Sequence, residues 1–205
     1  MSYVDDIQKV GHLTINEIIK ISNLYVPDIF KPCPWKYIDS QGRTLNHGTA
    51  VLETEELCSA YMSAYGPMHY HKLMRALDEN EFPYSDLAGG IEIYDWGCGQ
   101  AIGTMAVIEK FRQHGMLGKL RKVVLEEPSD VARDRAVIHV KKALEDNNAD
   151  VIAVSKYLPS DNGDNSNCIT SINVEQPTAI HIFSNILDIE AVSLKGVSKM
   201  ITSSG

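Results

Sequence analysis

The spacing of hydrophobic positions in the first part of the chain is typical of helices. Apolar residues recur every three or four positions, which places them on one face of a helix. The predicted helices cover residues 15–26, 54–65 and 68–77. Thr14, with a glutamate three positions later, has the form of a capping box, and the second helix is predicted to start at Thr54. Pro27 is expected to end the first helix, and Gly66 and Pro67 to separate the second from the third.

The pattern changes after residue 90 to short apolar runs that alternate with amphipathic stretches. The runs that favour strands are residues 91–94, 123–125, 151–154 and 179–183. One helical pattern passes through 102–111 and ends at Gly115, and another follows Ser129, a typical cap. Strands separated by helices of this length form parallel sheets. The predicted fold class is therefore α/β: a Rossmann-like, mostly parallel sheet with flanking helices, preceded by an N-terminal helical segment.

Composition and charge restrict the class of partner. Of 205 residues, 44% are hydrophobic and 22% are charged, the usual balance of a globular protein. The formal net charge of −8 disfavours bulk electrostatic binding to nucleic acid. The amino terminus has no basic start followed by an apolar core, and no apolar run reaches the roughly 18 residues of a membrane span. We therefore expect a cytoplasmic protein without a membrane partner.

The cysteine and histidine positions do not favour a metal site. None of the four cysteines forms a Cys-x-x-Cys pair or a zinc spacing. They are Cys33, Cys58, Cys98 and Cys168. Free thiols in a reducing cytoplasm are their simplest explanation. His69 and His71 lack a carboxylate or cysteine partner at ligand spacing, so no metal is expected.

A glycine turn between the first strand and the following helix is the strongest chemical signal. The segment 91–104 reads IEIYDWGCGQAIGT. Gly97 permits a tight turn, Gly99 lets the backbone approach a ligand, and the helix offers free N–H groups to an anion. Dinucleotide-binding turns require a third glycine where this chain has Ile102. The turn therefore favours another class of cofactor.

Together with Asp95, the turn resembles the first motif of class I S-adenosylmethionine-dependent methyltransferases, Asp/Glu-x-Gly-x-Gly-x-Gly. The resemblance implies that Asp95 holds the amino group of the methionine moiety of S-adenosylmethionine. It also implies that the backbone of the turn, from Gly97 through Cys98 to Gly99, receives the carboxylate. Ala101 replaces the last glycine of the motif, and its methyl group is expected to weaken or slightly displace the bound cofactor.

Two later segments extend the resemblance, which covers roughly residues 60–200. Glu126 and Glu127 follow the second predicted strand. Because the family's acid usually stands just before a Pro-Ser pair, the resemblance makes Glu127 the expected ligand of the ribose hydroxyls. The alternative is that both glutamates are solvated acids at a helix start. After the fourth strand, the resemblance places Ser184 and Asn185 near the transferred methyl group.

The resemblance also implies a division of the chain. Residues 1–85 are expected to form a helical extension or lid, and residues 86–205 the S-adenosylmethionine-binding, Rossmann-like domain. In the lid, Tyr61 and Tyr65 have two interpretations. Their rings face the positively charged sulfonium, or they belong to an ordinary helix face that packs on the sheet.

The function that the resemblance implies is methyl transfer from S-adenosylmethionine to an acceptor that the sequence does not identify. No catalytic residue is assigned, because positioning and desolvation can carry this reaction without a general base. An alternative from another class is a non-catalytic protein that keeps the cofactor fold for binding or assembly. An NAD-dependent reductase is disfavoured by Asp95 and Ile102.

The fourth predicted strand, residues 179–183, has no predicted neighbour on its outer side. Its sequence, AIHIF, lacks the lysines and prolines that protect exposed sheet edges. We therefore expect a sheet that is incomplete at its C-terminal side, in a fragment that lacks transferase activity alone. We also expect copies of the chain to pair through this edge as a homo-oligomer.

Overall fold

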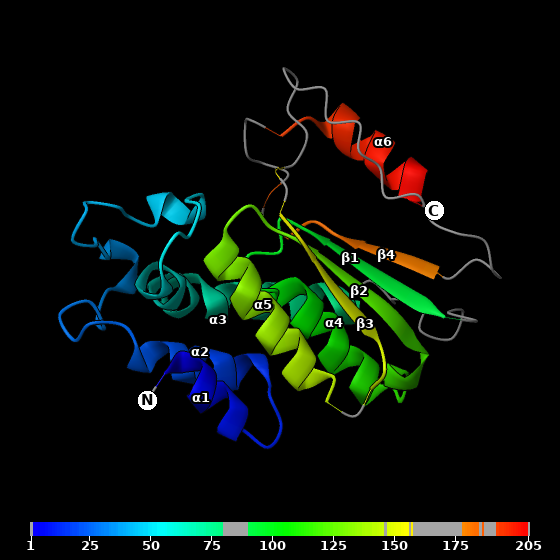
Figure 1. The fold of residues 1–205 in the computed structure, drawn as a ribbon, viewed down its shortest axis with the longest axis horizontal. Helices are drawn as coiled ribbons and strands as arrows, with labels where there is room; N and C mark the ends of the chain where they lie inside the picture. Colours follow the sequence, from blue (N-terminus) through cyan, green and yellow to red (C-terminus); the bar gives the residue numbers. More distant parts are fainter. Residues whose placement is uncertain are drawn as a thin grey trace.

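The structure is a computed structural model, and it describes residues 2–79, 90–145, 147–155, 157, 178–184, 186 and 192–204. At its centre is a four-stranded parallel sheet in the order β3-β2-β1-β4 (Figure 1). The strands are β1 (Ile91–Trp96), β2 (Leu120–Glu126), β3 (Asp150–Val154) and β4 (Thr178–Ile182). The predicted α/β class with a parallel sheet is confirmed, and a strand is found at each predicted place.

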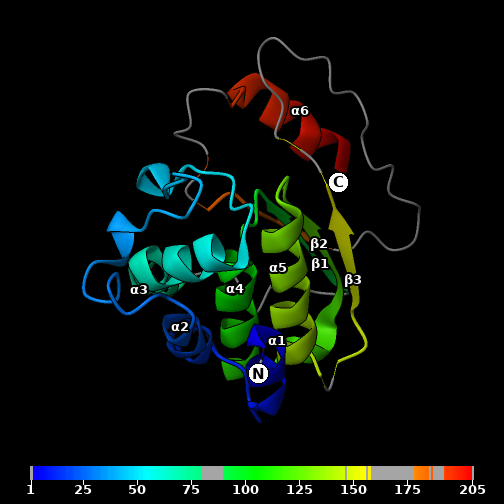
Figure 2. The same ribbon diagram turned by 60° about the vertical axis from the view of Figure 1, so that its left-hand side comes forward.

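The described helices, apart from the last one, form layers on one face of this sheet. They are α1 (Tyr3–Lys9), α2 (Ile15–Leu24), α3 (Glu55–Glu79), α4 (Ile102–Gln113), α5 (Asp130–Ala143) and α6 (Leu194–Ser204), with short 3₁₀ turns η1 (Pro34–Lys36), η2 (Asn46–Gly48) and η4 (Leu117–Lys119). α4 and α5 lie against the sheet, and α1, α2 and α3 pack outside them (Figures 1 and 2). α6 stands apart from these layers in both views. None of the described helices is both long and apolar enough to cross a membrane.

Side-chain caps begin two helices where the sequence predicts them. Thr14 Oγ1 accepts a hydrogen bond from the N–H of Glu17 (3.3 Å) at the start of α2. Ser129 Oγ accepts one from the N–H of Ala132 (3.1 Å) at the start of α5. Each cap satisfies a helix N–H that has no partner within the helix. α2 also ends before Pro27, as predicted.

The predicted break at Gly66 and Pro67 is wrong, because α3 runs through both residues. Pro67 removes one backbone donor from the helix. Tertiary packing of α3 on α2 compensates for this lost hydrogen bond. A Cβ on Gly66 would lie 2.9 Å from Met62 Sδ and 3.1 Å from Ile19 Cγ1, so the bare backbone of Gly66 lets the two helices come close together. Packing of this kind overrides local propensity.

α1 is a helix that the hydrophobic spacing does not predict. Ser2 Oγ accepts the N–H of Asp5 (3.2 Å), and Asp5 Oδ2 accepts the N–H of Ser2 (2.9 Å), which forms a reciprocal capping box. The helix buries Tyr3 and Ile7. Two buried residues in a seven-residue helix are too few for a periodic signal.

One continuous hydrophobic core joins the N-terminal helices to the sheet. Its members include Ile7 of α1, Ile18 of α2, Met62 of α3, Met105 of α4 and Val123 of β2. The N-terminal helices therefore pack directly on the α/β part of the chain. The predicted boundary between residues 85 and 86 lies outside the described residues.

β4 lies at one edge of the sheet. It pairs in parallel with β1 from Thr178 to Ile182, and no other described strand pairs with its outer side. The sheet is therefore open at β4 within the described part of the chain. Pairing of two copies through this edge stays a prediction.

Gly103 lies where α4 comes close to β4. A Cβ at this position would lie 2.7 Å from Ile182 Cγ2. We therefore expect Gly103→Ala to destabilise the fold by about 1–3 kcal/mol, despite the higher helix propensity of alanine. Gly118→Ala is the matched control, because nothing lies within 4 Å of a Cβ built there. Chemical denaturation measures the difference, and equal stability of the two variants would contradict this packing.

Candidate functional site

The turn after β1 has a left-handed backbone at alternate residues. The angle φ is +65° at Gly97, +53° at Gly99 and +63° at Ala101. The N–H of Cys98 donates to the carbonyl of Glu126 (2.9 Å), which ties the turn to the end of β2. Because glycine adopts positive φ without steric cost, the two glycines shape the turn as the sequence predicts.

Ala101 stands where the motif has its third glycine, and it adopts the conformation that favours glycine. Its φ of +63° and ψ of +33° cost a residue with a Cβ about 1–2 kcal/mol. The residue is fully buried in the main core, and its carbonyl accepts the N–H of Met105 (2.9 Å). The backbone path is therefore kept without the glycine. The expected weakening of cofactor binding by the methyl group stays a prediction.

Asp95 is a buried carboxylate near the carboxyl end of β1, with 1% of its surface exposed. Its Oδ2 accepts hydrogen bonds from the N–H (3.1 Å) and the hydroxyl (2.7 Å) of Thr104 in α4. Its Oδ1 is buried and has no hydrogen-bond partner among the described residues. Because an unsatisfied buried carboxylate oxygen is costly, this arrangement suits a ligand that donates a hydrogen bond to Oδ1.

The protonation of Asp95 is sensitive to its surroundings. Burial raises its pKa from 3.8 to about 6, and the charge of Glu127 adds to this increase. The hydrogen bonds from Thr104 act in the opposite direction. The carboxyl is therefore mostly ionised at neutral pH and protonated in mild acid. A cationic group at Oδ1 would favour the ionised form.

Glu127 reaches the glycine turn from the end of β2. Its Oε2 accepts the N–H of Gly99 (3.0 Å), and its Oε1 accepts the N–H of Ser129 (3.0 Å). The residue is 8% exposed. Burial raises the pKa of its carboxyl, and the two backbone hydrogen bonds lower it. Glu127 therefore contacts the turn, whereas its role toward a ribose stays a prediction.

The segment after β4 comes close to the same turn. A Cβ on Gly97 would lie 3.1 Å from Ile186 Cδ1, and a Cβ on Gly103 would lie 3.6 Å from Ser184 Cβ. Ser184 is therefore near the start of α4, while Asn185 lies outside the described residues. Ile186 is a neighbour of the turn that sequence reasoning did not single out, since an isolated aliphatic residue in a loop carries no chemical signal.

Three aromatic rings lie along one face of α3. The centroids of Tyr61 and Tyr65 are 5.2 Å apart, and the His69 ring lies 6.0 and 6.1 Å from them. Burial raises the pKa of Tyr61 to about 12, and the charge of Glu127 adds to this increase. Both tyrosines pack on a second core cluster that contains no strand residue, and a role of their rings toward the sulfonium stays a prediction.

Cys98 contributes to the turn through its backbone. Its side chain is buried, and burial raises the pKa of the thiol well above its ordinary value, so the thiol is protonated at neutral pH. A protonated, buried thiol is a poor nucleophile and a poor metal ligand. In the described part of the chain, no group of three or more His, Cys, Asp or Glu residues could hold a metal ion.

Known proteins do not identify the ligand of this site. No protein-family model matches the chain, and a search of curated proteins finds no significant match. The ligand is therefore inferred from the turn and its two carboxylates, Asp95 and Glu127.

Proposed function

We propose that the chain binds S-adenosylmethionine at the turn after β1 and takes part in transfer of its methyl group to an acceptor. The observation that carries the proposal is Asp95 Oδ1, a buried oxygen without a hydrogen-bond partner among the described residues. The amino group of the cofactor's methionine moiety is a cation with N–H donors. It would supply both the missing hydrogen bond and a compensating charge.

The same carboxylate argues against a dinucleotide. Enzymes that bind NAD place the pyrophosphate at the turn after the first strand. A phosphate beside the Asp95 carboxylate would be repelled, and the low exposure of Asp95 (1%) leaves little water to screen that repulsion. The site therefore favours a ligand with a cation at this position.

Glu127 would bind the ribose hydroxyls of the cofactor. Each of its oxygens accepts one N–H, from Gly99 and from Ser129. A carboxylate oxygen can accept a second hydrogen bond. Ribose hydroxyls could therefore donate to Glu127 while both backbone bonds remain, and the turn would not need to rearrange.

The chain would act mainly by positioning the reactants. S-adenosylmethionine supplies a sulfonium methyl group that an acceptor nucleophile attacks, so that the bond to the nucleophile forms while the bond between sulfur and methyl breaks and a neutral thioether leaves. Asp95 would hold the amino end of the cofactor and Glu127 its ribose, which fixes the direction of the methyl group between them. Tyr61, whose pKa is about 12, stays neutral and can face a cation with its ring.

Titration calorimetry tests this proposal. We expect S-adenosylmethionine and its demethylated product to bind with saturation at pH 7.5, and NADH not to bind. Asp95→Ala should weaken binding about 10- to 150-fold, because a buried hydrogen bond to a charged group contributes about 1.5–3 kcal/mol. The control is Asp134→Ala, which removes an exposed carboxylate from α5 and should leave the affinity unchanged. Unchanged affinity in Asp95→Ala, or tighter binding of NADH, would contradict the proposal.

A further inference from the structure

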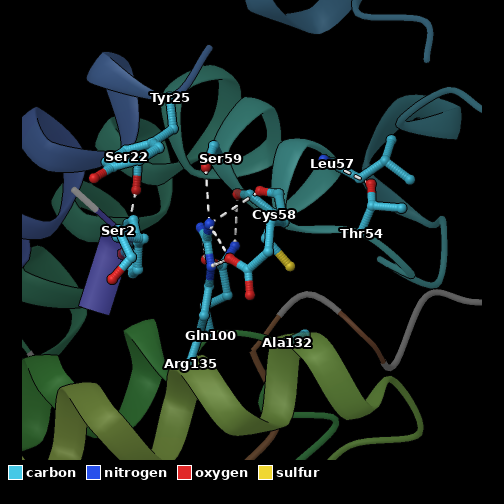
Figure 3. Close-up of polar contacts among 12 residues, drawn as sticks. Ser2, Ser22, Tyr25, Thr54, Leu57, Cys58, Ser59, Gln100, Ala132 and Arg135 are labelled. Atoms are coloured by element: carbon cyan, nitrogen blue, oxygen red, sulfur yellow. Dashed lines mark hydrogen bonds and ion pairs between the residues drawn. The ribbon is translucent and has the colours of Figure 1, made fainter. Parts of the chain in front are cut away.

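A buried arginine joins the N-terminal helices to the glycine turn. Arg135 of α5 is 1% exposed and points toward α3 (Figure 3). Its guanidinium donates to Glu55 Oε2 (2.6 Å), to the Glu55 carbonyl (3.0 Å) and to Ser59 Oγ (3.0 Å). It also donates to Gln100 Oε1 (3.3 Å), and its central carbon lies 3.6 Å from the centre of the Tyr3 ring. α1, α3, α5 and the turn therefore meet at this one side chain.

Gln100 is the residue of the turn that enters this network. It lies between Gly99 and Ala101, both of which have positive φ. Its Nε2 donates to the carbonyl of Cys58 in α3 (2.8 Å), and its Oε1 accepts from Arg135. The residue is 2% exposed. A glutamine amide is suited to this position, because it presents a donor to a carbonyl and an acceptor to a guanidinium at once.

A third anchor holds the backbone of Gln100. His139 Nδ1 lies 3.0 Å from the Gln100 carbonyl, and His139 Nε2 lies 2.8 Å from the Tyr3 hydroxyl. Because a carbonyl only accepts, Nδ1 carries the proton and Nε2 accepts from Tyr3. Burial lowers the pKa of His139 to about 4 and raises that of Tyr3 to about 12. Both groups are therefore neutral at physiological pH, as this chain of hydrogen bonds requires.

We propose that Gln100 is a positioning residue for the cofactor, through which the N-terminal helices fix the conformation of the glycine turn. Gly97 and Gly99 can adopt many backbone conformations, so the turn has little conformational preference of its own. The three anchors on Gln100 select one conformation, and that conformation places the Gly99 N–H on Glu127. This proposal rests on the proposed function, since it assigns a role toward S-adenosylmethionine.

The test compares Gln100→Met with Ser59→Ala. Gln100→Met keeps a side chain of similar length but removes the hydrogen bonds to Cys58 and Arg135. Ser59→Ala removes a hydrogen bond to the same arginine, but Ser59 has no hydrogen bond to the turn. Two quantities are measured for each: the affinity for S-adenosylmethionine, and the hydrogen-exchange rates of the Gly99 and Ala101 amides.

We expect Gln100→Met to weaken S-adenosylmethionine binding at least tenfold and to speed amide exchange in the turn at least tenfold. Ser59→Ala should leave the affinity and the exchange rates within about twofold of the wild-type values. This holds even if its melting temperature falls as much as that of Gln100→Met. Gln100→Glu provides a second variant if the methionine variant does not fold. It keeps an acceptor for Arg135 but loses the donor to Cys58, so exchange in the turn should again rise.

The outcomes separate this inference from the proposed function. If the Gln100→Met and Ser59→Ala variants have the same affinity for S-adenosylmethionine and the same exchange rates, the positioning role of Gln100 is wrong. If the wild-type chain does not bind S-adenosylmethionine, the proposed function is wrong. In that case unchanged exchange in the Gln100 variants would overturn the positioning role as well, and faster exchange would show that Gln100 still fixes the turn.

Discussion

Asp95→Asn is expected to stabilise the unliganded protein by about 1–3 kcal/mol at pH 8 while it weakens cofactor binding. The pKa of Asp95 is raised to about 6 from 3.8, which corresponds to about 3 kcal/mol between its two protonation states. Asparagine removes the buried charge. Its amide group lacks a partner at the Oδ1 position, and this offsets part of the gain.

The pH dependence of this effect distinguishes it from a general change in packing. Because the folded-state pKa of Asp95 is raised, its contribution to stability is fully present below about pH 3.8 and is lost as the pH rises through 6. The advantage of Asp95→Asn should therefore be largest above pH 6 and vanish near pH 4. Urea denaturation across this range measures it, with Asp134→Asn as the control. An advantage that does not change with pH would contradict the raised pKa.

The contribution of His139 to the free energy of unfolding changes with pH in the opposite direction to that of Asp95. Burial lowers its pKa to about 4 from 6.5, so its contribution is present above pH 6.5 and is lost as the pH falls through 4. In the wild-type chain the effects of His139 and Asp95 largely cancel between pH 4 and 6. Asp95→Asn removes the effect of Asp95 and leaves that of His139. The stability of this variant should therefore fall more steeply in acid than that of the wild type.

Arg135→Met is expected to destabilise the protein by about 3 kcal/mol or more. The change removes the hydrogen bonds to Glu55, Ser59 and Gln100 and the contact with the Tyr3 ring. It leaves buried acceptors without a donor, and each of these costs about 1–3 kcal/mol. The flexible methionine fills part of the space, which limits the loss from a cavity.

Lys141→Met is the matched control for Arg135→Met. Lys141 is an exposed cation on the same helix, and surface substitutions usually change stability by less than about 0.5 kcal/mol. Denaturation at pH 7 compares the two variants. Equal stability would show that the buried network contributes nothing beyond what methionine packing can replace.

The sequence predicts the local parts of this fold better than the long-range parts. The caps at Thr14 and Ser129 and the short apolar runs depend on neighbouring residues, and all of them are confirmed. The continuation of α3 through Pro67 depends on its contact with α2. No local pattern contains that contact, so the sequence predicts a break there.

The candidate site divides in the same way. Asp95, Gly97, Gly99 and Glu127 lie at or just beyond the carboxyl ends of two successive strands of a parallel sheet, so their approach at one edge follows from the chain order. Thr104 and Gln100 were not predicted as partners of the site. Their roles depend on which helix face meets the sheet and on Arg135, which comes from another helix. Asn185 lies outside the described residues, and its predicted role remains untested.

The most direct test of the central claim is to map the binding of S-adenosylmethionine onto the backbone amides by NMR. The amides of Gly97, Gly99 and Thr104 should shift and saturate together as S-adenosylmethionine or its demethylated product is added. Gly42 and Gly118, which have open space around them, should not shift. NADH at the same concentration should leave the turn unchanged. Shifts that avoid the turn, or that NADH reproduces there, would contradict the assignment of this site to S-adenosylmethionine.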